Sequence, residues 1–113
     1  MQYQFETEED VLKVLVSGRL VASCAEEFKD TMFERLKDSK KILFNLKDME
    51  HIDSSGLGVV VSLLQWKNTE GGSIKLCCLQ PRLRIVFEIT KVYRIFDIHG
   101  TEAEAMAAFK SQS

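Results

Sequence analysis

Residues 52–58 read Ile52-Asp53-Ser54-Ser55-Gly56-Leu57-Gly58 and separate two different sequence patterns. A short apolar run at residues 42–46 and a polar loop at 47–53 precede this segment, and an apolar stretch follows it. Ser and Asp favour helix starts because their side-chain oxygens accept hydrogen bonds from the first free backbone N–H groups. The pattern therefore predicts a strand at 42–46, then a loop, then a helix over about 55–69.

The chain before this junction predicts a hairpin and a helix. Residues 3–7 and 11–17 are rich in strand-forming side chains and flank an acidic turn, which is typical of a β-hairpin. Ser23 and Glu26 have the spacing of a capping box, which predicts a helix start. The apolar positions that follow recur every four residues at Phe28, Met32 and Leu36. This period indicates a helix of about fifteen residues.

The chain after the junction predicts two further strands, each followed or preceded by a helix. Gly71 and Gly72 suit a left-handed helix cap before a strand at 73–79. Pro81 suits the first turn of a third helix, whose inner face carries Leu83, Val86, Phe87 and Thr90. A last strand is expected at 93–98. Thr101 and Glu104 form a second capping box, which opens a final helix ending near residue 109.

The expected order is thus ββαβαβαβα. Strands that alternate with helices favour a largely parallel sheet with right-handed crossovers. We therefore expect a single α/β domain over residues 1–113, with about five strands, four helices and an N-terminal hairpin.

Composition narrows the classes of function. Hydrophobic residues make up 45% of the 113 residues, which indicates a folded domain. The formal net charge is −2 and acidic and basic residues alternate, so we expect no nucleic-acid partner. No apolar run approaches the roughly 20 residues that span a bilayer, and the polar first ten residues are unlike a secretory signal. We expect a soluble, cytoplasmic protein without direct membrane insertion.

The three cysteines, Cys24, Cys77 and Cys78, have no metal-ligand spacing. Cys77 and Cys78 fall within an expected strand, where neighbouring side chains point to opposite faces. We therefore expect three reduced structural thiols, without a bridge between the adjacent pair, and no metal site.

Two glycines distinguish the junction from an ordinary capped helix. Gly56 and Gly58 fall in the first turns of the expected helix, where each costs about 1 kcal/mol relative to Ala. Glycine allows close backbone approach and leaves the neighbouring hydroxyls of Ser54 and Ser55 unshielded. The run fits either a well-capped helix alone or a site at which the serines face another molecule.

The expected helix at 55–69 carries two apolar stripes. One comprises Leu57, Val60, Val61 and Leu64 and can face the sheet. The other comprises Val59, Leu63 and Trp66 and lies almost opposite, at 100° per residue. Either a neighbouring helix covers this second stripe, or it forms an exposed apolar patch suited to protein recognition beside the serines.

These residues resemble the STAS family, named for sulfate transporters and anti-sigma factor antagonists. The run at 52–58 matches the family signature, and the likeness extends from the Ser-Gly-Arg-Leu turn at 17–20 to the segment 79–96. Within the family the chain looks most like a free-standing anti-sigma factor antagonist. The resemblance implies that it binds an anti-sigma factor that is also a serine kinase.

The resemblance also implies a phosphorylation switch. The kinase would phosphorylate Ser55, with Ser54 as the alternative acceptor, and so end the association, and a serine phosphatase would restore it. The kinase would supply ATP and Mg²⁺, so the chain itself would need no cofactor. The partner-binding residues expected around the acceptor are Val21, Asp53, Ser54, Gly56, Leu57, Gly58, Val59, Leu63 and Trp66.

The chain departs from the family pattern at two positions. Val21 stands after Gly18-Arg19-Leu20, where the family commonly has Asp, and Asn45 stands where the family commonly has Asp in the strand before the signature. Both positions lie near the partner-facing end in the family. A kinase contact made by a carboxylate there would be lost.

Two other functions compete with the switch. Ser54 or Ser55 with His51 and Asp53 supplies the ingredients of a hydrolase, but all lie within five residues, whereas a triad usually draws its base from elsewhere in the fold. We therefore expect no catalytic residues and no enzyme activity. The remaining alternative is a constitutive adaptor, such as a subunit of a membrane transporter or another signalling complex.

Overall fold

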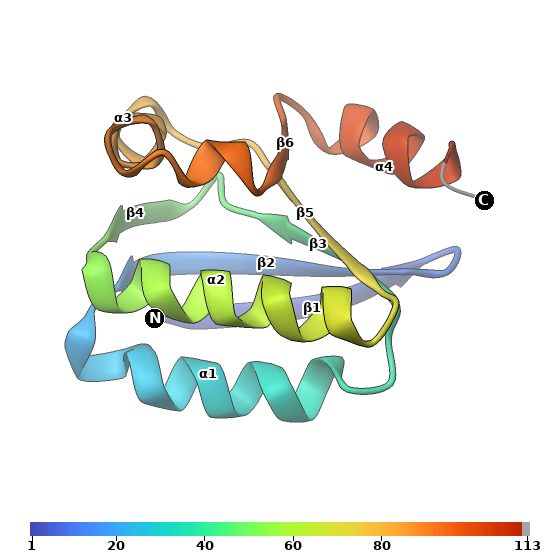
Figure 1. Cartoon of the computed structure of the whole chain (residues 1–113), viewed down its shortest axis with the longest axis horizontal. Coiled ribbons are helices and arrows are strands. Elements are labelled where there is room, and N and C mark those ends of the chain that lie inside the picture. The colour runs from blue at the N-terminus through green and yellow to red at the C-terminus, as the bar shows by residue number, and fades with distance from the viewer. Residues whose placement is uncertain (112–113) are drawn as a thin grey trace.

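The computed structural model describes residues 1–111. These residues form a mixed sheet of six strands with four α-helices and one short 3-10 helix (Figure 1). In chain order the elements are β1 (Gln2–Glu8), β2 (Val11–Leu20), α1 (Ala22–Leu36), β3 (Lys41–Asn45), β4 (Met49–Ile52), α2 (Ser54–Thr69), β5 (Ser73–Cys77), α3 (Pro81–Thr90), η1 (Val92–Arg94), β6 (Asp97–His99) and α4 (Glu102–Lys110).

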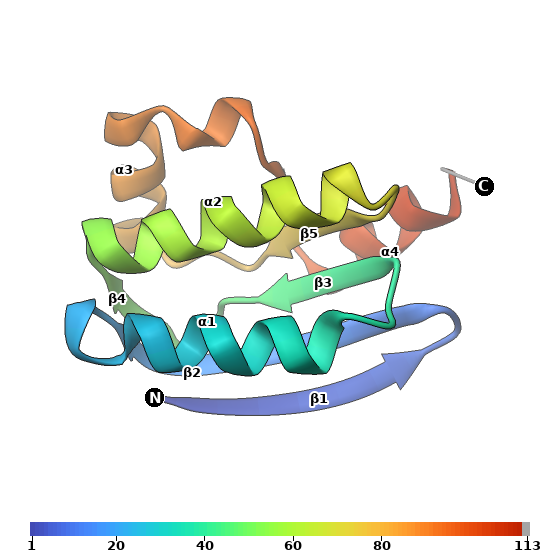
Figure 2. The same ribbon diagram turned by 60° about the horizontal axis from the view of Figure 1, so that its bottom comes forward.

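The sheet has the strand order β1-β2-β3-β5-β6. β1 pairs antiparallel with β2, as the hairpin predicted, and every other pairing in the sheet is parallel. Helices α1 and α2 lie side by side over one face, and α4 lies against the other (Figure 2). The expected α/β fold, with a mostly parallel sheet and an N-terminal hairpin, is therefore confirmed.

The main core lies between the sheet and the α1/α2 layer. Alternate residues of the central strands point into it, including Val14, Ile42, Phe44 and Leu76, and all are at most 2% exposed. On the other face, a smaller apolar cluster joins the sheet to α4 through Val11, Leu43, Cys77, Ala105, Met106 and Phe109. The two-sided burial explains why the parallel strands carry continuous apolar runs.

Two stretches differ from the expected element order. The loop expected at 47–53 contains a sixth strand, β4, because β2 continues to Leu20 and its last residues pair with residues 49–52. The strand expected at 93–98 is only residues 97–99 long, because α3 ends in a left-handed cap at Lys91 and the chain then forms the η1 turn. Tyr93 and Ile95 consequently stay exposed.

The predicted helix caps had mixed outcomes. In α4, the Thr101 hydroxyl accepts from the Glu104 backbone N–H at 3.1 Å and donates to its carboxylate at 3.0 Å, so this cap is confirmed. The Ser23 cap is wrong, because α1 begins at Ala22, with Val21 in the cap position and no side-chain cap of its own. At the end of α2, Gly71 has the expected left-handed conformation, with φ of +82°.

The adjacent cysteines do not point to opposite faces, contrary to expectation. β5 ends at Cys77, and Cys78 has a positive φ of 65°, so strand alternation does not reach it. Both side chains pack against the apolar cluster under α4. Each of the three cysteines is a free thiol.

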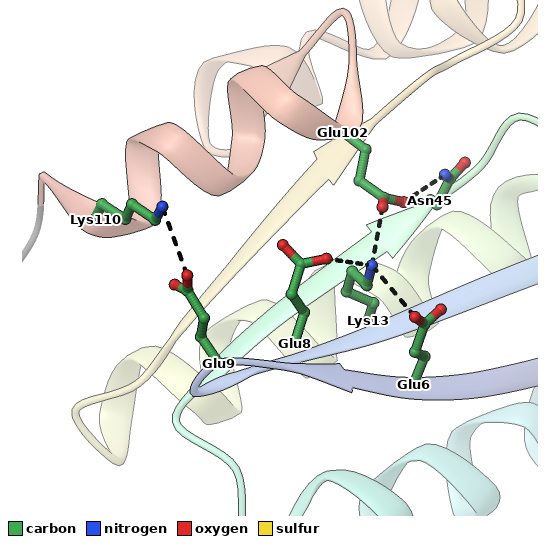
Figure 3. Close-up of polar contacts among 7 residues, drawn as sticks. All are labelled: Glu6, Glu8, Glu9, Lys13, Asn45, Glu102 and Lys110. Atoms are coloured by element: carbon green, nitrogen blue, oxygen red, sulfur yellow. Dashed lines mark hydrogen bonds and ion pairs between the residues drawn. The ribbon is translucent and has the colours of Figure 1, made fainter.

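Charged side chains fasten α4 to the hairpin (Figure 3). The ammonium group of Lys13, whose side chain is 10% exposed, contacts a Glu102 carboxylate oxygen at 3.0 Å, and the other oxygen of that carboxylate accepts from Asn45 Nδ2 at 3.0 Å. At the far end of the helix, Lys110 lies 3.6 Å from Glu9. The Asn45 and Lys13 contacts lower the pKa of Glu102 below its usual range.

Replacing Glu102 with Gln should therefore destabilise the protein in a pH-dependent way. A carboxyl with a lowered pKa stabilises the folded state above its unfolded pKa of about 4.3, and this stabilisation is lost as pH falls through the lower folded value. Urea unfolding should show the variant less stable than wild type at pH 7, with the difference shrinking below about pH 4. Glu26→Gln, on an exposed side of α1, is the matched control. A difference that stays constant down to pH 2.5, or an equal loss in the control, would contradict this account.

Among residues 1–111, no helix combines the length and apolar character needed to cross a membrane. Over the same residues, no cluster of three or more His, Cys, Asp or Glu side chains is arranged to hold a metal ion.

Candidate functional site

Asp53 joins the starts of two helices. One carboxylate oxygen accepts from the Gly56 backbone N–H at 2.9 Å and so caps α2, and the other accepts from the Ala22 N–H at 2.9 Å, at the start of α1. Its own N–H donates to the Leu20 carbonyl at the end of β2. The Gly56 and Ala22 hydrogen bonds lower the pKa of the Asp53 carboxyl below its usual range. A fixed negative charge therefore lies where both helices begin.

Ser54 and Ser55 follow in the first turn of α2, and both are exposed. Within residues 1–111 neither hydroxyl has a hydrogen-bond partner, because Asp53 takes the capping role that a serine could have filled. The hydroxyls are therefore free to react or to contact another molecule. The N-terminus of a helix carries partial positive charge, so a phosphate here would be tolerated within the domain.

Packing within the chain explains only one of the two glycines of the junction. A Cβ on Gly56 would lie 2.3 Å from the Leu20 carbonyl oxygen and 2.7 Å from the Leu20 Cγ, so glycine is required for α2 to approach β2. A Cβ on Gly58 would meet no atom of residues 1–111 within 4 Å, apart from its chain neighbours and its own helix backbone. Packing within the chain thus accounts for Gly56, which is buried, and leaves the exposed Gly58 unexplained.

A shallow apolar groove of about 380 Å³ borders the serines. It runs between the first half of α2 and the α3–η1 segment. Asp53, Ser54 and Gly58 line it on the α2 side, and its apolar walls come from Leu57, Val61, Val86 and Val92. The sequence placed Val86 and Thr90 on the inner face of α3, but Val86 is half-buried and Thr90 exposed, because both face this groove. The sequence pattern could not reveal this groove, because it does not show that α2 and α3 are neighbours.

The second apolar stripe of α2 is covered. Leu63 is fully buried and Val59 is 8% exposed, and the Trp66 ring meets that of Phe33 of α1 edge-on, with centroids 4.5 Å apart. The alternative of an exposed patch at Val59, Leu63 and Trp66 is therefore wrong, because α1 packs beside α2 (Figure 2). Val59 and Leu63 belong to the core, and the half-buried Trp66 packs against it.

Of the other residues that the sequence analysis singled out, some lie at the site and some do not. Val21 lies at the site, since it precedes Ala22, whose N–H binds Asp53. Asn45 does not: it is 8% exposed and hydrogen-bonded to Glu102 under α4 (Figure 3). His51 lies on β4, and over residues 1–111 it makes no hydrogen bond to Ser54 or Ser55. The arrangement therefore lacks the base-to-hydroxyl contact that activates a serine nucleophile.

Comparison with known proteins shows the family of the chain. Residues 2–105 match the model of the STAS domain. The chain belongs to the STAS domain family. The anti-sigma-B factor antagonist of Bacillus subtilis is 31% identical over 90 residues, which are 80% of this STAS protein and 83% of that relative.

Solved structures agree with the fold. The crystal structure of a Thermotoga maritima protein matches with a TM-score of 0.89 at 30% identity, covering 94% of this STAS protein and 92% of that chain. The anti-sigma factor antagonist SpoIIAA matches with a TM-score of 0.71 in its unphosphorylated form, at 20% identity and with 96% and 98% coverage. Its phosphorylated form from Bacillus gives 0.69 at 21%, with 96% and 99% coverage. At these identities the likeness to SpoIIAA concerns the fold alone.

Proposed function

We propose that this STAS protein is an anti-sigma factor antagonist, which binds an anti-sigma factor and so frees a sigma factor in the cytoplasm. The observation that carries the proposal is the pair of exposed serines at the start of α2, whose hydroxyls make no hydrogen bond within residues 1–111 and which follow the Asp53 cap. The antagonist named among its relatives supports the class of partner. The protein acts by binding, and it needs no cofactor or metal.

The anti-sigma factor is also a serine kinase, which supplies ATP and Mg²⁺ and phosphorylates Ser55, with Ser54 as the alternative acceptor. A phosphate adds a charge of about −1.5 to −2 near neutral pH. Beside the fixed charge of Asp53, this would repel a partner packed on the same surface, whereas the helix N-terminus would keep the domain itself stable. A serine phosphatase restores the binding form. SpoIIAA, whose fold this chain shares, has been solved in an unphosphorylated and a phosphorylated form, and we propose the same two forms here.

The surface that meets the partner surrounds Ser55. It comprises Ser54, the exposed face of Gly58, and Asp53 with Val21 at the start of α1, and the buried Leu57 lies beneath it as a wall of the groove. Gly58 has open space around it, so a partner backbone can approach the helix closely there.

Displacement of a sigma factor tests this function. The purified STAS protein is added to a complex of sigma factor and anti-sigma factor from the source genome, and the mixture is resolved by gel filtration. We expect free sigma factor and a new complex between the anti-sigma factor and the STAS protein. A sigma complex that stays intact with each anti-sigma factor of that genome would contradict the proposal.

A further inference from the structure

Two neighbouring cysteines at the end of β5 place their side chains together. Cys77 is the last residue of the strand, whereas Cys78 has a positive φ of 65°, which is uncommon for a residue other than glycine. In a continuous strand the two side chains would point to opposite faces. With the strand ended by a left-handed residue, both side chains pack against the apolar cluster under α4.

Hydrogen bonds on both sides hold the backbone in this conformation. The Cys77 carbonyl accepts from the Leu46 N–H at 3.0 Å, and the Cys78 N–H donates to the His99 carbonyl at 3.2 Å. A left-handed residue other than glycine costs free energy and persists where its surroundings fix it, most often at functional positions. The proposed serine switch makes no use of either cysteine, so the paired thiols need a separate explanation.

The two thiols differ in their access to solvent. Cys77 is 0% exposed, whereas Cys78 is half-buried. Burial and the neighbouring Cys78 thiol raise the pKa of the Cys77 thiol well above its usual range. Because reactivity follows exposure and thiolate character, a small oxidant reacts first at Cys78. Cys77 then lies beside the oxidised sulfur, in the place of a resolving thiol.

We propose that Cys77 and Cys78 are a redox-sensitive pair, which a hydroperoxide converts to a disulfide between the adjacent residues. With hydrogen peroxide, the Cys78 sulfur attacks one peroxide oxygen, the O–O bond breaks, and the sulfenic acid of Cys78 and one water form. The Cys77 sulfur then attacks the Cys78 sulfur, the S–O bond breaks, and the hydroxyl leaves with the Cys77 proton as a second water. The two thiols lose two electrons and two protons, and the peroxide accepts them.

The bridge should be reversible. Neighbouring Cα atoms are about 3.8 Å apart, whereas ordinary disulfides join Cα atoms about 4.4–6.8 Å apart. A bridge between neighbours is therefore strained, and strained disulfides are readily reduced by thiols. Such a bond suits a transient modification better than a permanent structural link. The inference does not depend on the proposed function, because it involves neither the serines nor a partner protein.

The test treats the folded full chain with hydrogen peroxide, blocks the remaining thiols with iodoacetamide in urea, and analyses tryptic peptides by mass spectrometry. Cleavage after Lys75 and Arg82 releases residues 76–82, which contain Cys77 and Cys78 and no other cysteine. We expect this peptide to carry no alkyl group and to be about 2 Da lighter than its dithiol form. Dithiothreitol added before alkylation should restore two alkylation sites.

Cys24→Ser is the matched control. Cys24 packs on the other face of the sheet, against the main core, and its thiol donates to the Arg19 carbonyl at 3.3 Å. The Cys24→Ser variant should therefore form the bridge to the same extent as wild type. Cys78→Ser should leave the buried Cys77 reduced and open to alkylation after unfolding.

Several results would overturn the inference. They are two alkylated cysteines in peptide 76–82 after peroxide treatment, oxygen adducts on that peptide without the loss of 2 Da, and a disulfide between two chains. Equal oxidation of Cys77 in Cys78→Ser would also do so. An equal yield of the bridge in protein unfolded by urea before oxidation would show that the turn at Cys78 does not pair the thiols.

Discussion

Replacing Gly56 with Ala is expected to destabilise the protein by about 3 kcal/mol or more, because the added methyl group would be forced into the backbone of β2. The Leu20 carbonyl oxygen would lie 2.3 Å from the new carbon, and the Ile52 side chain 3.1 Å away. Neither β2 nor the start of α2 can move freely, since Asp53 ties both to α1. Urea unfolding followed by circular dichroism would measure the loss as a lower midpoint at unchanged slope.

Gly58→Ala is the matched control two residues later. Its methyl group meets nothing within 4 Å, so the change should stabilise α2 by up to about 1 kcal/mol through helix propensity. If both substitutions had the same effect on stability, the close approach at Gly56 would not be the reason for glycine there. If Gly58→Ala folds well and yet fails to displace the sigma factor, the open space at Gly58 serves the partner.

Ser55→Asp is expected to lower affinity for the anti-sigma factor by about 100-fold, close to abolishing sigma release. The substitution puts a permanent negative charge beside Asp53, where a partner surface would have to desolvate both groups. The fold should not suffer, because the Ser55 side chain is exposed and makes no hydrogen bond to the described part of the chain, residues 1–111. An acidic residue in the first turn of a helix is also favourable. Thermal unfolding of the variant should match that of wild type.

The serine switch also predicts how two related variants bind. Ser55→Ala should still bind, since it removes no contact on which the fold depends. Lys29→Asp, on α1 and away from the groove, changes charge without approaching the serines and should bind as wild type. Unchanged affinity of Ser55→Asp in the same assay would contradict the switch and favour a constitutive adaptor.

Much of the fold followed from local sequence patterns. The Asp-Ser-Ser-Gly junction predicted the start of α2 to within one residue, because capping depends on neighbours in sequence. Strand β4 was missed, since it is short and exists only because the end of β2 offers an unpaired edge. The start of α1 was misplaced for a similar reason. Its cap comes from Asp53, 31 residues away, and no local motif records such a contact.

The sequence suggested a candidate site at residues 52–58, but the side chains around it depend on how the helices pack. The two apolar stripes of α2 were visible in the sequence, but only the packing of α1 against Phe33 and Trp66 decides which stripe is covered. The groove needs Val86 beside Leu57, and this pairing depends on how the helices pack rather than on any period in either one. Asn45 was expected near the partner, but its side chain points to the α4 face and binds Glu102.

The most direct test of the switch is the mass of the protein before and after incubation with ATP and extract from the source cell, with fragmentation to locate any modification. We predict the gain of one phosphoryl group on Ser55, its loss in Ser55→Ala, and its retention in Ser54→Ala. No added mass, in an extract shown to phosphorylate a control antagonist, would contradict the account.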